Sequence, residues 1–210
     1  MILAPNLLAL DGLVHGFGIR ESEYPAGIVT VKQIHSSIVR TPNDVPCEGD
    51  AMISDRPEVI VGIKTADCVP VLLADPVTRT VAAIHAGWRG TAAHIVDEAI
   101  AAMSKKWQTR PEDLRAAIGP SIGACCYEVG AEVARQFGIE ATGAVHLDLP
   151  LENAKQLRAA GVRNIRISGE CTFCAAGRFF SWRRERERAG RMISFVGFSG
   201  PAQKTSGGPI

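Results

Sequence analysis

The fold is organised around the stretch G-I-K-T-A-D-C-V-P-V-L-L-A-D-P-V-T-R-T-V-A-A-I-H-A-G-W-R-G, residues 62–90. Two apolar runs flank Asp75-Pro76, a pair that typically starts a turn. The stretch therefore predicts a β-hairpin with Cys68 at the head of its first strand and His85 at the tail of its second. Such a hairpin brings a thiol close to an imidazole, and the G-W-R-G segment that follows predicts the start of a helix.

The composition is that of an ordinary globular chain. Of its 210 residues, 46% are hydrophobic and 21% are charged, which is enough for one well-filled domain. The 23 basic and 22 acidic residues nearly cancel, so the bulk charge predicts neither nucleic-acid nor membrane binding and favours a small-molecule partner. No apolar run approaches the roughly 20 residues of a membrane span, and the N-terminus lacks a basic region and a cleavage site. We therefore expect a cytoplasmic protein with reduced or metal-binding cysteines, either a monomer or a small homo-oligomer.

Helical and strand-like segments alternate irregularly along the chain. This pattern predicts an α+β fold with mixed β-sheets, in one domain spanning residues 1–210. The strand-like runs are nearly continuous in hydrophobicity, so both faces of the central strands should be covered. Thr91 can cap the helix that follows it. The expected strands are 28–34, 51–54, 58–64, 69–74, 80–85, 114–118, 144–147, 164–167 and 191–198, and the expected helices are 92–107, 131–137 and 151–160.

Two histidines and one cysteine lie at expected strand ends, where a scaffold holds side chains rigidly toward a cleft. His35 follows the strand expected at 28–34, His85 ends another strand, and Cys68 begins the segment between them. Two imidazoles and one thiolate suit Zn²⁺ and leave a fourth position for water or substrate. Cu²⁺ accepts the same ligands. Since the spacing matches no motif, the alternative is a buried cysteine and two histidines that hydrogen-bond to the backbone.

Two polar residues beside these candidates also fit a catalytic site. Asp67 adjoins Cys68 and can orient a ligand or transfer protons, although a turn carboxylate that caps a backbone amide would look the same. Arg89 stands where the expected helix begins, so its guanidinium and the free N–H groups near Thr91 can bind an oxyanion or phosphate. The alternative for Arg89 is a surface residue stacked on Trp88.

The remaining cysteines are expected to be structural. Cys171 and Cys174 form a C-x-x-C, but no second C-x-x-C exists to complete a four-cysteine zinc site. Cys125 and Cys126 are neighbours in sequence, which should place them poorly for binding one tetrahedral metal together. Cys47 is expected to be structural as well.

Seven segments match a known family in order along the chain. They are K-Q-I-H-S (32–36), G-D-A-M-I-S (49–54), T-A-D-C-V-P-V (65–71), I-H-A-G-W-R-G (84–90), A-I-G-P-S-I-G (117–123), C-Y-E-V-G (126–130) and R-F-F-S-W-R-R (178–184). The chain closely resembles the bacterial laccase-domain family, whose members are called polyphenol oxidases, purine nucleoside phosphorylases or peptidoglycan-editing factors.

The resemblance implies a fold, a metal site and a chemistry. The fold would be a four-layer α/β/β/α arrangement of mixed sheets, related to a toxin deamidase with a Cys/His site. The metal would be zinc, with the ligands His35, Cys68 and His85. The activities would be phosphorolysis of adenosine, inosine and methylthioadenosine, together with deamination of adenosine.

This function suggests roles for further residues. The catalytic candidates are Cys68, Asp67 and Arg89, with Asp67 transferring protons. The substrate-binding candidates, chiefly for phosphate, are Arg20, Arg89, Thr91 and Arg183. Family members usually carry a Gly-Gly-Val-Ser loop and a helix before the His-bearing segment, whereas here only residues 21–27 bridge that interval. One wall of the pocket should therefore be shorter.

Two other functions follow from the same resemblance. A copper-dependent polyphenol oxidase is one, but a multicopper oxidase needs several copper centres with His-x-His pairs, and this chain has five histidines and no such pair. An editing factor that removes a wrongly loaded peptidoglycan precursor is the other, and it rests on the family alone. A purely structural or binding role is the remaining alternative.

Overall fold

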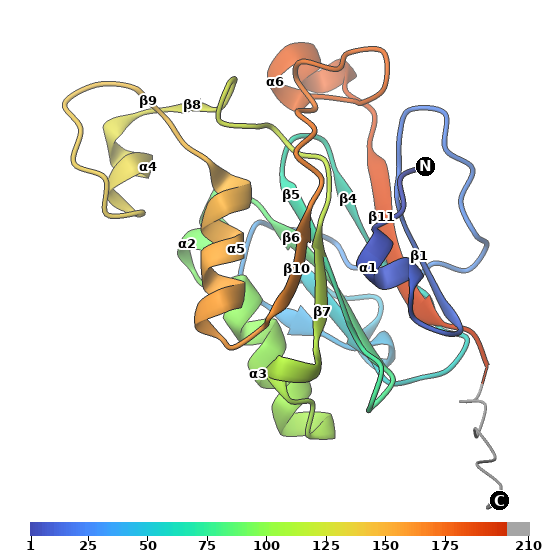
Figure 1. The fold of residues 1–210 in the computed structure, drawn as a ribbon. Helices are drawn as coiled ribbons and strands as arrows, with labels where there is room; N and C mark the ends of the chain where they lie inside the picture. The colour runs from blue at the N-terminus through green and yellow to red at the C-terminus, as the bar shows by residue number, and fades with distance from the viewer. Residues whose placement is uncertain (201–210) are drawn as a thin grey trace, which may run out of the picture.

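A six-stranded sheet with the order β10-β7-β5-β6-β3-β2 forms the centre of the computed structural model, which describes residues 1–200 (Figure 1). The β10–β7 and β3–β2 pairs are parallel and the other pairs are antiparallel, so this sheet is mixed, as expected. Its strands are β2 (Val39–Arg40), β3 (Ala51–Ser54), β5 (Val69–Asp75), β6 (Thr80–Ala86), β7 (Arg115–Ile118) and β10 (Asn164–Ile167).

The predicted hairpin is confirmed as the middle of this sheet. β5 and β6 pair antiparallel, with Pro70 opposite His85 and Asp75 opposite Thr80. Asp75 closes the turn, because its carboxylate accepts hydrogen bonds from the Val77 backbone N–H and the Thr78 hydroxyl, each at 2.7 Å. The hairpin register therefore fixes where the residues at its open end lie.

Both faces of the hairpin are buried, as the continuous apolar runs predict. Val71 and Leu73 face a core on the helical side, whereas Leu72 and Ala74 face a core shared with a second sheet. The second sheet is antiparallel, with the order β1-β11-β4, and consists of β1 (Leu13–Phe17), β11 (Met192–Phe198) and β4 (Val61–Thr65). Since burying one such aliphatic side chain contributes about 1.5–3 kcal/mol, the hairpin is a rigid base for the residues at its ends.

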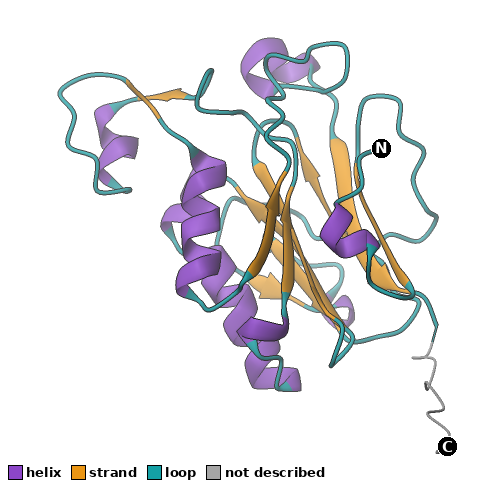
Figure 2. Ribbon diagram, viewed as in Figure 1, coloured by secondary structure: helices purple, strands orange, loops and turns teal. Residues whose placement is uncertain are grey.

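The helices lie mainly on one side of the large sheet (Figure 2). Helices α2, α3 and α5 contact its strands, while α1 lies at the edge between the two sheets and α6 lies beyond the strand ends. The elements outside the two sheets are α1 (Pro5–Leu8), α2 (Trp88–Ala92), α3 (Ile95–Trp107), α4 (Ala131–Arg135), α5 (Leu149–Ala159), α6 (Trp182–Glu185), the small pair β8 (Glu128–Val129) and β9 (Val145–His146), and three single 3₁₀ turns, η1 (Pro42–Asp44), η2 (Pro111–Asp113) and η3 (Arg186–Arg188). Within residues 1–200, none of the helices is both long and apolar enough to cross a bilayer.

Three expectations about these elements are wrong. The helix expected after Thr91 is two helices, because α2 already begins at Trp88 and the chain breaks at His94, whose φ is +57°. The strand expected at 28–34 forms only single bridges, at Val29 and Lys32, to different partners. The expected four-layer α/β/β/α arrangement lacks its second helical layer, because no helix in the described residues covers the outer face of the small sheet. Tyr24 instead packs edge-on against Phe195 of β11, with ring centroids 6.5 Å apart.

Candidate metal centre

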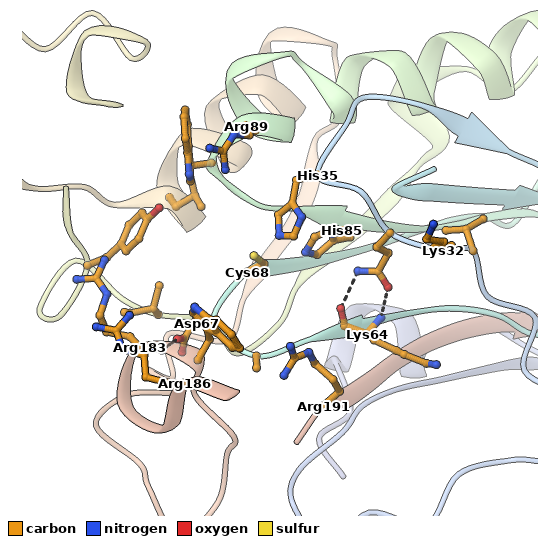
Figure 3. Close-up of a pocket in the computed structure, with 18 residues that line it drawn as sticks. Lys32, His35, Lys64, Asp67, Cys68, His85, Arg89, Arg183, Arg186 and Arg191 are labelled. Atoms are coloured by element: carbon orange, nitrogen blue, oxygen red, sulfur yellow. Dashed lines mark hydrogen bonds between the residues drawn. The ribbon is translucent and has the colours of Figure 1, made fainter. Parts of the chain in front are cut away.

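His35, Cys68 and His85 converge at one end of the hairpin (Figure 3). One ligand atom from each of the three residues lies within 4.8 Å of the others. The two imidazole rings meet edge to face, with centroids 4.9 Å apart and an interplanar angle of 77°. The structure thus brings together the three metal-ligand candidates that the sequence indicates.

The local backbone explains this convergence. Cys68 directly precedes β5 and His85 lies near the end of β6, so the antiparallel register places both at the same edge of the sheet. His35 comes from a loop and has a left-handed φ of +61°. The close approach also needs Gly87, where a Cβ would lie 3.1 Å from the Cys68 sulfur and 3.3 Å from a His35 ring carbon.

Asp50 is fully buried and contacts both the His35 loop and the His85 ring. Its carboxylate accepts hydrogen bonds from the backbone N–H groups of Ile34 (3.3 Å), His35 (2.9 Å) and Ser36 (2.6 Å) and from the Ser36 hydroxyl (2.7 Å). It also lies 2.8 Å from Nδ1 of His85, which leaves Nε2 of that ring directed away from the carboxylate. Asp50 therefore fixes both the left-handed His35 loop and the orientation of His85.

The sequence reasoning missed Asp50 as a functional residue. Its one signal was its place in the G-D-A-M-I-S segment (49–54). The sequence around Asp50 does not show which residues its side chain contacts, because these residues lie 14 to 35 positions away.

The half-buried Cys68 and the buried His85 and Asp50 shift one another's protonation. Burial opposes ionisation of Cys68, but hydrogen bonds from His35 and His85 lower its pKa from 9.0 to about 6. Burial likewise opposes charge on His85, but Asp50 and Cys68 raise its pKa from 6.5 to about 9. Against the effect of its own burial, Asp50 has a pKa lowered from 3.8 to about 2 by His85 and Ser36. Cys68 is thus a thiolate at neutral pH, the form in which cysteine binds metals.

The centre forms the floor of a pocket of about 750 Å³. Three aromatic side chains, those of Trp88, Tyr127 and Trp182, give the pocket apolar walls. Among residues 1–200, its lining includes one carboxylate, that of Asp67, and six cationic side chains, which are Lys32, Lys64, Arg89, Arg183, Arg186 and Arg191 (Figure 3). The pocket therefore suits an anion beside an aromatic group.

Two of the predicted substrate residues lie in this pocket. Arg89 is exposed, with its guanidinium 4.3 Å from the Trp88 ring centroid, and no side-chain hydrogen bond or ion pair within residues 1–200 engages it. Arg183 donates a hydrogen bond to the Glu128 carbonyl (3.0 Å) and lies 5.5 Å from the Tyr127 ring centroid. Both cations thus face the cavity, as expected.

Asp67 lines the pocket, but its carboxylate is turned toward the C-terminal loops. It accepts hydrogen bonds from the hydroxyls of Thr172 (2.6 Å) and Ser181 (3.0 Å) and from the backbone N–H of Arg183 (2.7 Å). These contacts tie the hairpin to the start of α6. They support a positioning role for Asp67 and give no support to the expected role in proton transfer.

Arg20 and Thr91 are not among the described residues that line the pocket, so the structure gives no support to their expected role in substrate binding. The Arg20 guanidinium donates to the carbonyls of Ala176 (2.8 Å) and Phe179 (3.0 Å) and pairs with Glu185. Thr91 is fully buried, and its hydroxyl accepts a hydrogen bond from Asn153 of α5 at 3.0 Å. Both residues use their polar atoms to join elements of the fold.

Residues 21–27, which were expected to shorten a pocket wall, are absent from the pocket lining among the described residues. Sequence reasoning also missed the cations Lys32, Lys64 and Arg191, and it left open whether the arginines of the charge run 183–188, Arg186 among them, face the solvent or the cleft. Arg186 belongs to a charge run that resembles a solvated surface, and the two lysines carry no local pattern.

A family model described as "Multi-copper polyphenol oxidoreductase laccase" matches residues 18–199. The chain belongs to this laccase family. Curated members of the family are named as enzymes, so the expectation that the chain is an enzyme is confirmed at that level.

Three relatives illustrate the similarity. A purine nucleoside phosphorylase from Clostridium acetobutylicum is 40% identical over 176 residues, covering 79% of this chain and 75% of the relative. A purine nucleoside phosphorylase from Deinococcus radiodurans is 41% identical over 158 residues, covering 71% of this chain and 61% of the relative. An adenosine deaminase named RL5, from an unknown prokaryotic organism, is 38% identical over 161 residues, covering 70% of this chain and 61% of the relative.

Two solved structures share the fold. The crystal structure of YlmD from Geobacillus stearothermophilus matches with a TM-score of 0.84 at 28% identity, covering 94% of both chains. That of YfiH from Bacillus licheniformis matches with a TM-score of 0.77 at 33% identity, covering 82% of this chain and 74% of that one. The expected single α+β domain with mixed β-sheets is therefore confirmed.

The family implies a metal, and the donor set fits one. Two imidazoles and a thiolate within 4.8 Å of one another suit both zinc and copper. Asp50 supplies the buried carboxylate that metal-binding histidines commonly need behind them. Three protein ligands would leave one coordination position facing the pocket.

Proposed function

We propose that this laccase-family chain is a zinc-dependent purine nucleoside phosphorylase that also deaminates adenosine. We also propose that residues 1–210 form a single domain, which carries both activities. The observation that carries the proposal is the convergence of His35, Cys68 and His85 on the floor of a pocket with aromatic walls and cations. The names of the relatives support the same assignment.

We propose zinc as the metal that this site binds. One three-ligand site with an open position is the usual arrangement of catalytic zinc, with His35, Cys68 and His85 as the ligands. Bound there, zinc would supply Lewis acidity toward water and substrate oxygen. The remaining steps depend on side chains of this chain.

The pocket suits both halves of a nucleoside. Trp88 and Tyr127 offer aromatic faces for the purine, and burial raises the pKa of Tyr127 to about 12, so its hydroxyl keeps its proton and can donate to a purine nitrogen. Arg89 and Arg183 offer guanidinium groups, which bind phosphate through paired hydrogen bonds. In phosphorolysis, a phosphate oxygen bonds to ribose C1′ while the bond from C1′ to purine N9 breaks, and the purine leaves with that electron pair and gains a proton.

Deamination uses the same pocket without phosphate. A water oxygen bonds to purine C6, and the amino group leaves as ammonia after proton transfer. The carboxylate of Asp67 holds α6 and the Arg183 backbone in place, so that the pocket wall keeps its shape. Adenosine can therefore lose its amino group with or without phosphate, whereas its glycosidic bond breaks only when phosphate is present.

The test is a product analysis with zinc-loaded protein and adenosine, with and without phosphate. We expect adenine only when phosphate is present, and inosine in both cases. Cys68→Ala should remove both products, whereas Cys47→Ser, a change at a half-buried residue packed against the core between the sheets, should remove neither. Folded, zinc-loaded protein that makes neither adenine nor inosine, while the Clostridium acetobutylicum relative is active in the same assay, would refute the proposal.

Two second candidates keep some support. Copper-dependent phenol oxidation has the family description and a donor set that accepts copper in its favour. Editing of a peptidoglycan precursor is favoured by the six pocket cations, which also suit the phosphates of a nucleotide-linked sugar. Oxygen consumption with a phenol by copper-loaded protein would favour the first, and accumulation of a mis-loaded precursor in a deletion strain would favour the second.

A further inference from the structure

Four cysteines outside the pocket lie together on the surface. Cys125 and Cys126 follow β7, and Cys171 and Cys174 follow β10. Their four sulfur atoms all lie within 4.8 Å of one another. Cys174 is 3.3 Å from the sulfur of Cys126 and 3.7 Å from that of Cys125. The expectation that the two neighbouring cysteines are poorly placed to share a metal is therefore wrong.

The sheet topology explains how the two loops meet. β7 and β10 are adjacent parallel strands, so the loops that follow them leave the same edge of the sheet (Figure 1). The loops then pair again, because the Ser121 N–H donates to the Glu170 carbonyl at 3.3 Å and the Thr172 N–H donates to the Ser121 carbonyl at 2.9 Å. A tight turn on the Gly123 carbonyl, which accepts from the N–H groups of Cys126 and Tyr127, directs the adjacent cysteines toward the C-x-x-C.

The sulfur separations fit a single metal ion better than a disulfide or a cluster. Four sulfurs around zinc at about 2.3 Å are about 3.8 Å apart, which is the range seen here. A disulfide needs sulfurs about 2.05 Å apart. A four-iron cluster holds its iron and sulfide atoms between the cysteines and therefore needs them farther apart.

The surroundings of the sulfurs also favour thiolate ligands. The Gly123 N–H donates to the Cys171 sulfur at 3.3 Å, an interaction that stabilises negative charge on sulfur. Four thiols this close cannot all ionise without a cation, and a divalent ion removes that conflict.

We propose that Cys125, Cys126, Cys171 and Cys174 bind one zinc ion as a closed four-thiolate site. Four protein ligands leave no open position, so this zinc is structural, unlike the one proposed for the pocket. It joins the loop that carries Tyr127 to the loop in which Thr172 holds Asp67. Its role is to fix one wall of the pocket, whatever substrate the pocket takes.

Metal content tests the proposal directly. Protein purified under reducing conditions with zinc should hold two zinc ions per chain. Cys68→Ala should hold one, and the double variant Cys171→Ser/Cys174→Ser should also hold one. Cys47→Ser, the matched control, should hold two.

Cobalt substitution keeps the test decisive if the double variant fails to fold. Cys68→Ala loaded with cobalt should show the intense sulfur-to-cobalt charge-transfer absorption of a tetrahedral four-thiolate site. Zinc should protect the four cysteines from alkylation in that same variant, and a chelator alone should restore their reaction. Folded Cys68→Ala that takes up neither zinc nor cobalt, or cysteines that react only after a reductant is added, would overturn the proposal.

Discussion

Replacing Asp50 with asparagine should weaken both the fold and the metal centre. Asp50 is fully buried, and its lowered pKa, about 2 against 3.8, corresponds to about 2 kcal/mol of stability from the ionised form. An asparagine amide would also turn its N–H₂ toward at least one N–H donor of the His35 loop, and a buried unsatisfied donor costs about 1–3 kcal/mol. We therefore expect the free energy of unfolding of metal-free protein to fall by about 3–5 kcal/mol.

The pH dependence gives a sharper form of the same prediction. Because the folded-state pKa of Asp50 is depressed, its contribution is fully present above the unfolded value of 3.8 and is lost as the pH falls through about 2. Urea unfolding at neutral pH should thus show the full difference between Asp50→Asn and the parent chain, and the difference should shrink below pH 4. Zinc affinity, measured by competition with a chelator, should drop by about 10- to 100-fold since His85 loses its orienting carboxylate.

Asp97→Asn is the matched control, because Asp97 also bonds a histidine Nδ1, that of His94, at 2.7 Å, but on the surface of α3. It should change stability by less than about 1 kcal/mol and leave zinc affinity unaltered. If Asp50→Asn unfolds like the parent chain and binds zinc equally well, the hydrogen bonds of Asp50 do not organise the centre, and the reasoning fails.

Three further predictions concern the same site. His85 must lose a proton to bind zinc, and its pKa is raised to about 9. The zinc dissociation constant should therefore fall about tenfold for each pH unit from about 6 to about 9, and more steeply below about 6, where Cys68 is also protonated. A zinc dissociation constant that does not change with pH in chelator competition would contradict this. Gly87→Ala should weaken zinc binding about tenfold, since its Cβ would press on Cys68 at 3.1 Å, whereas Gly177→Ala, with open space around it, should not. Arg89→Ala should raise the KM for phosphate about 10- to 100-fold, because Arg89 lines the pocket. Arg20→Ala should lower the melting temperature and leave that KM unchanged, because Arg20 bonds to backbone carbonyls. Equal effects of the two variants on the KM would contradict the phosphate-binding role of Arg89 and the structural role of Arg20.

The central part of the fold could be predicted from the sequence because its signals are local. The β5–β6 hairpin has continuous apolar runs and a turn aspartate whose hydrogen bonds reach only two or three residues. The same hairpin register brings Cys68 and His85 together, so those two candidates needed little beyond the pattern. The premise for His35 was wrong, because the strand expected before it does not form and Asp50 holds His35 in a loop.

Contacts between distant segments could not be read from the sequence. Arg20 looks like a free cation until its bonds to carbonyls 156 and 159 positions away are known. The four clustered cysteines show the same difficulty, since neither C-C nor C-x-x-C alone indicates that two parallel strands end side by side. Residues at the ends of neighbouring strands should therefore be compared as a set, whatever their spacing in the chain.

The hydrogen bonds of Asp67 span 105, 114 and 116 positions of sequence, and this has a consequence for biosynthesis. The three proposed metal ligands, the last of which is His85, are translated well before Thr172, Ser181 and Arg183. Contacts of such long range form late in folding, because they must close the longest loops. A nascent chain thus completes its pocket only after residues 172–183 have left the ribosome.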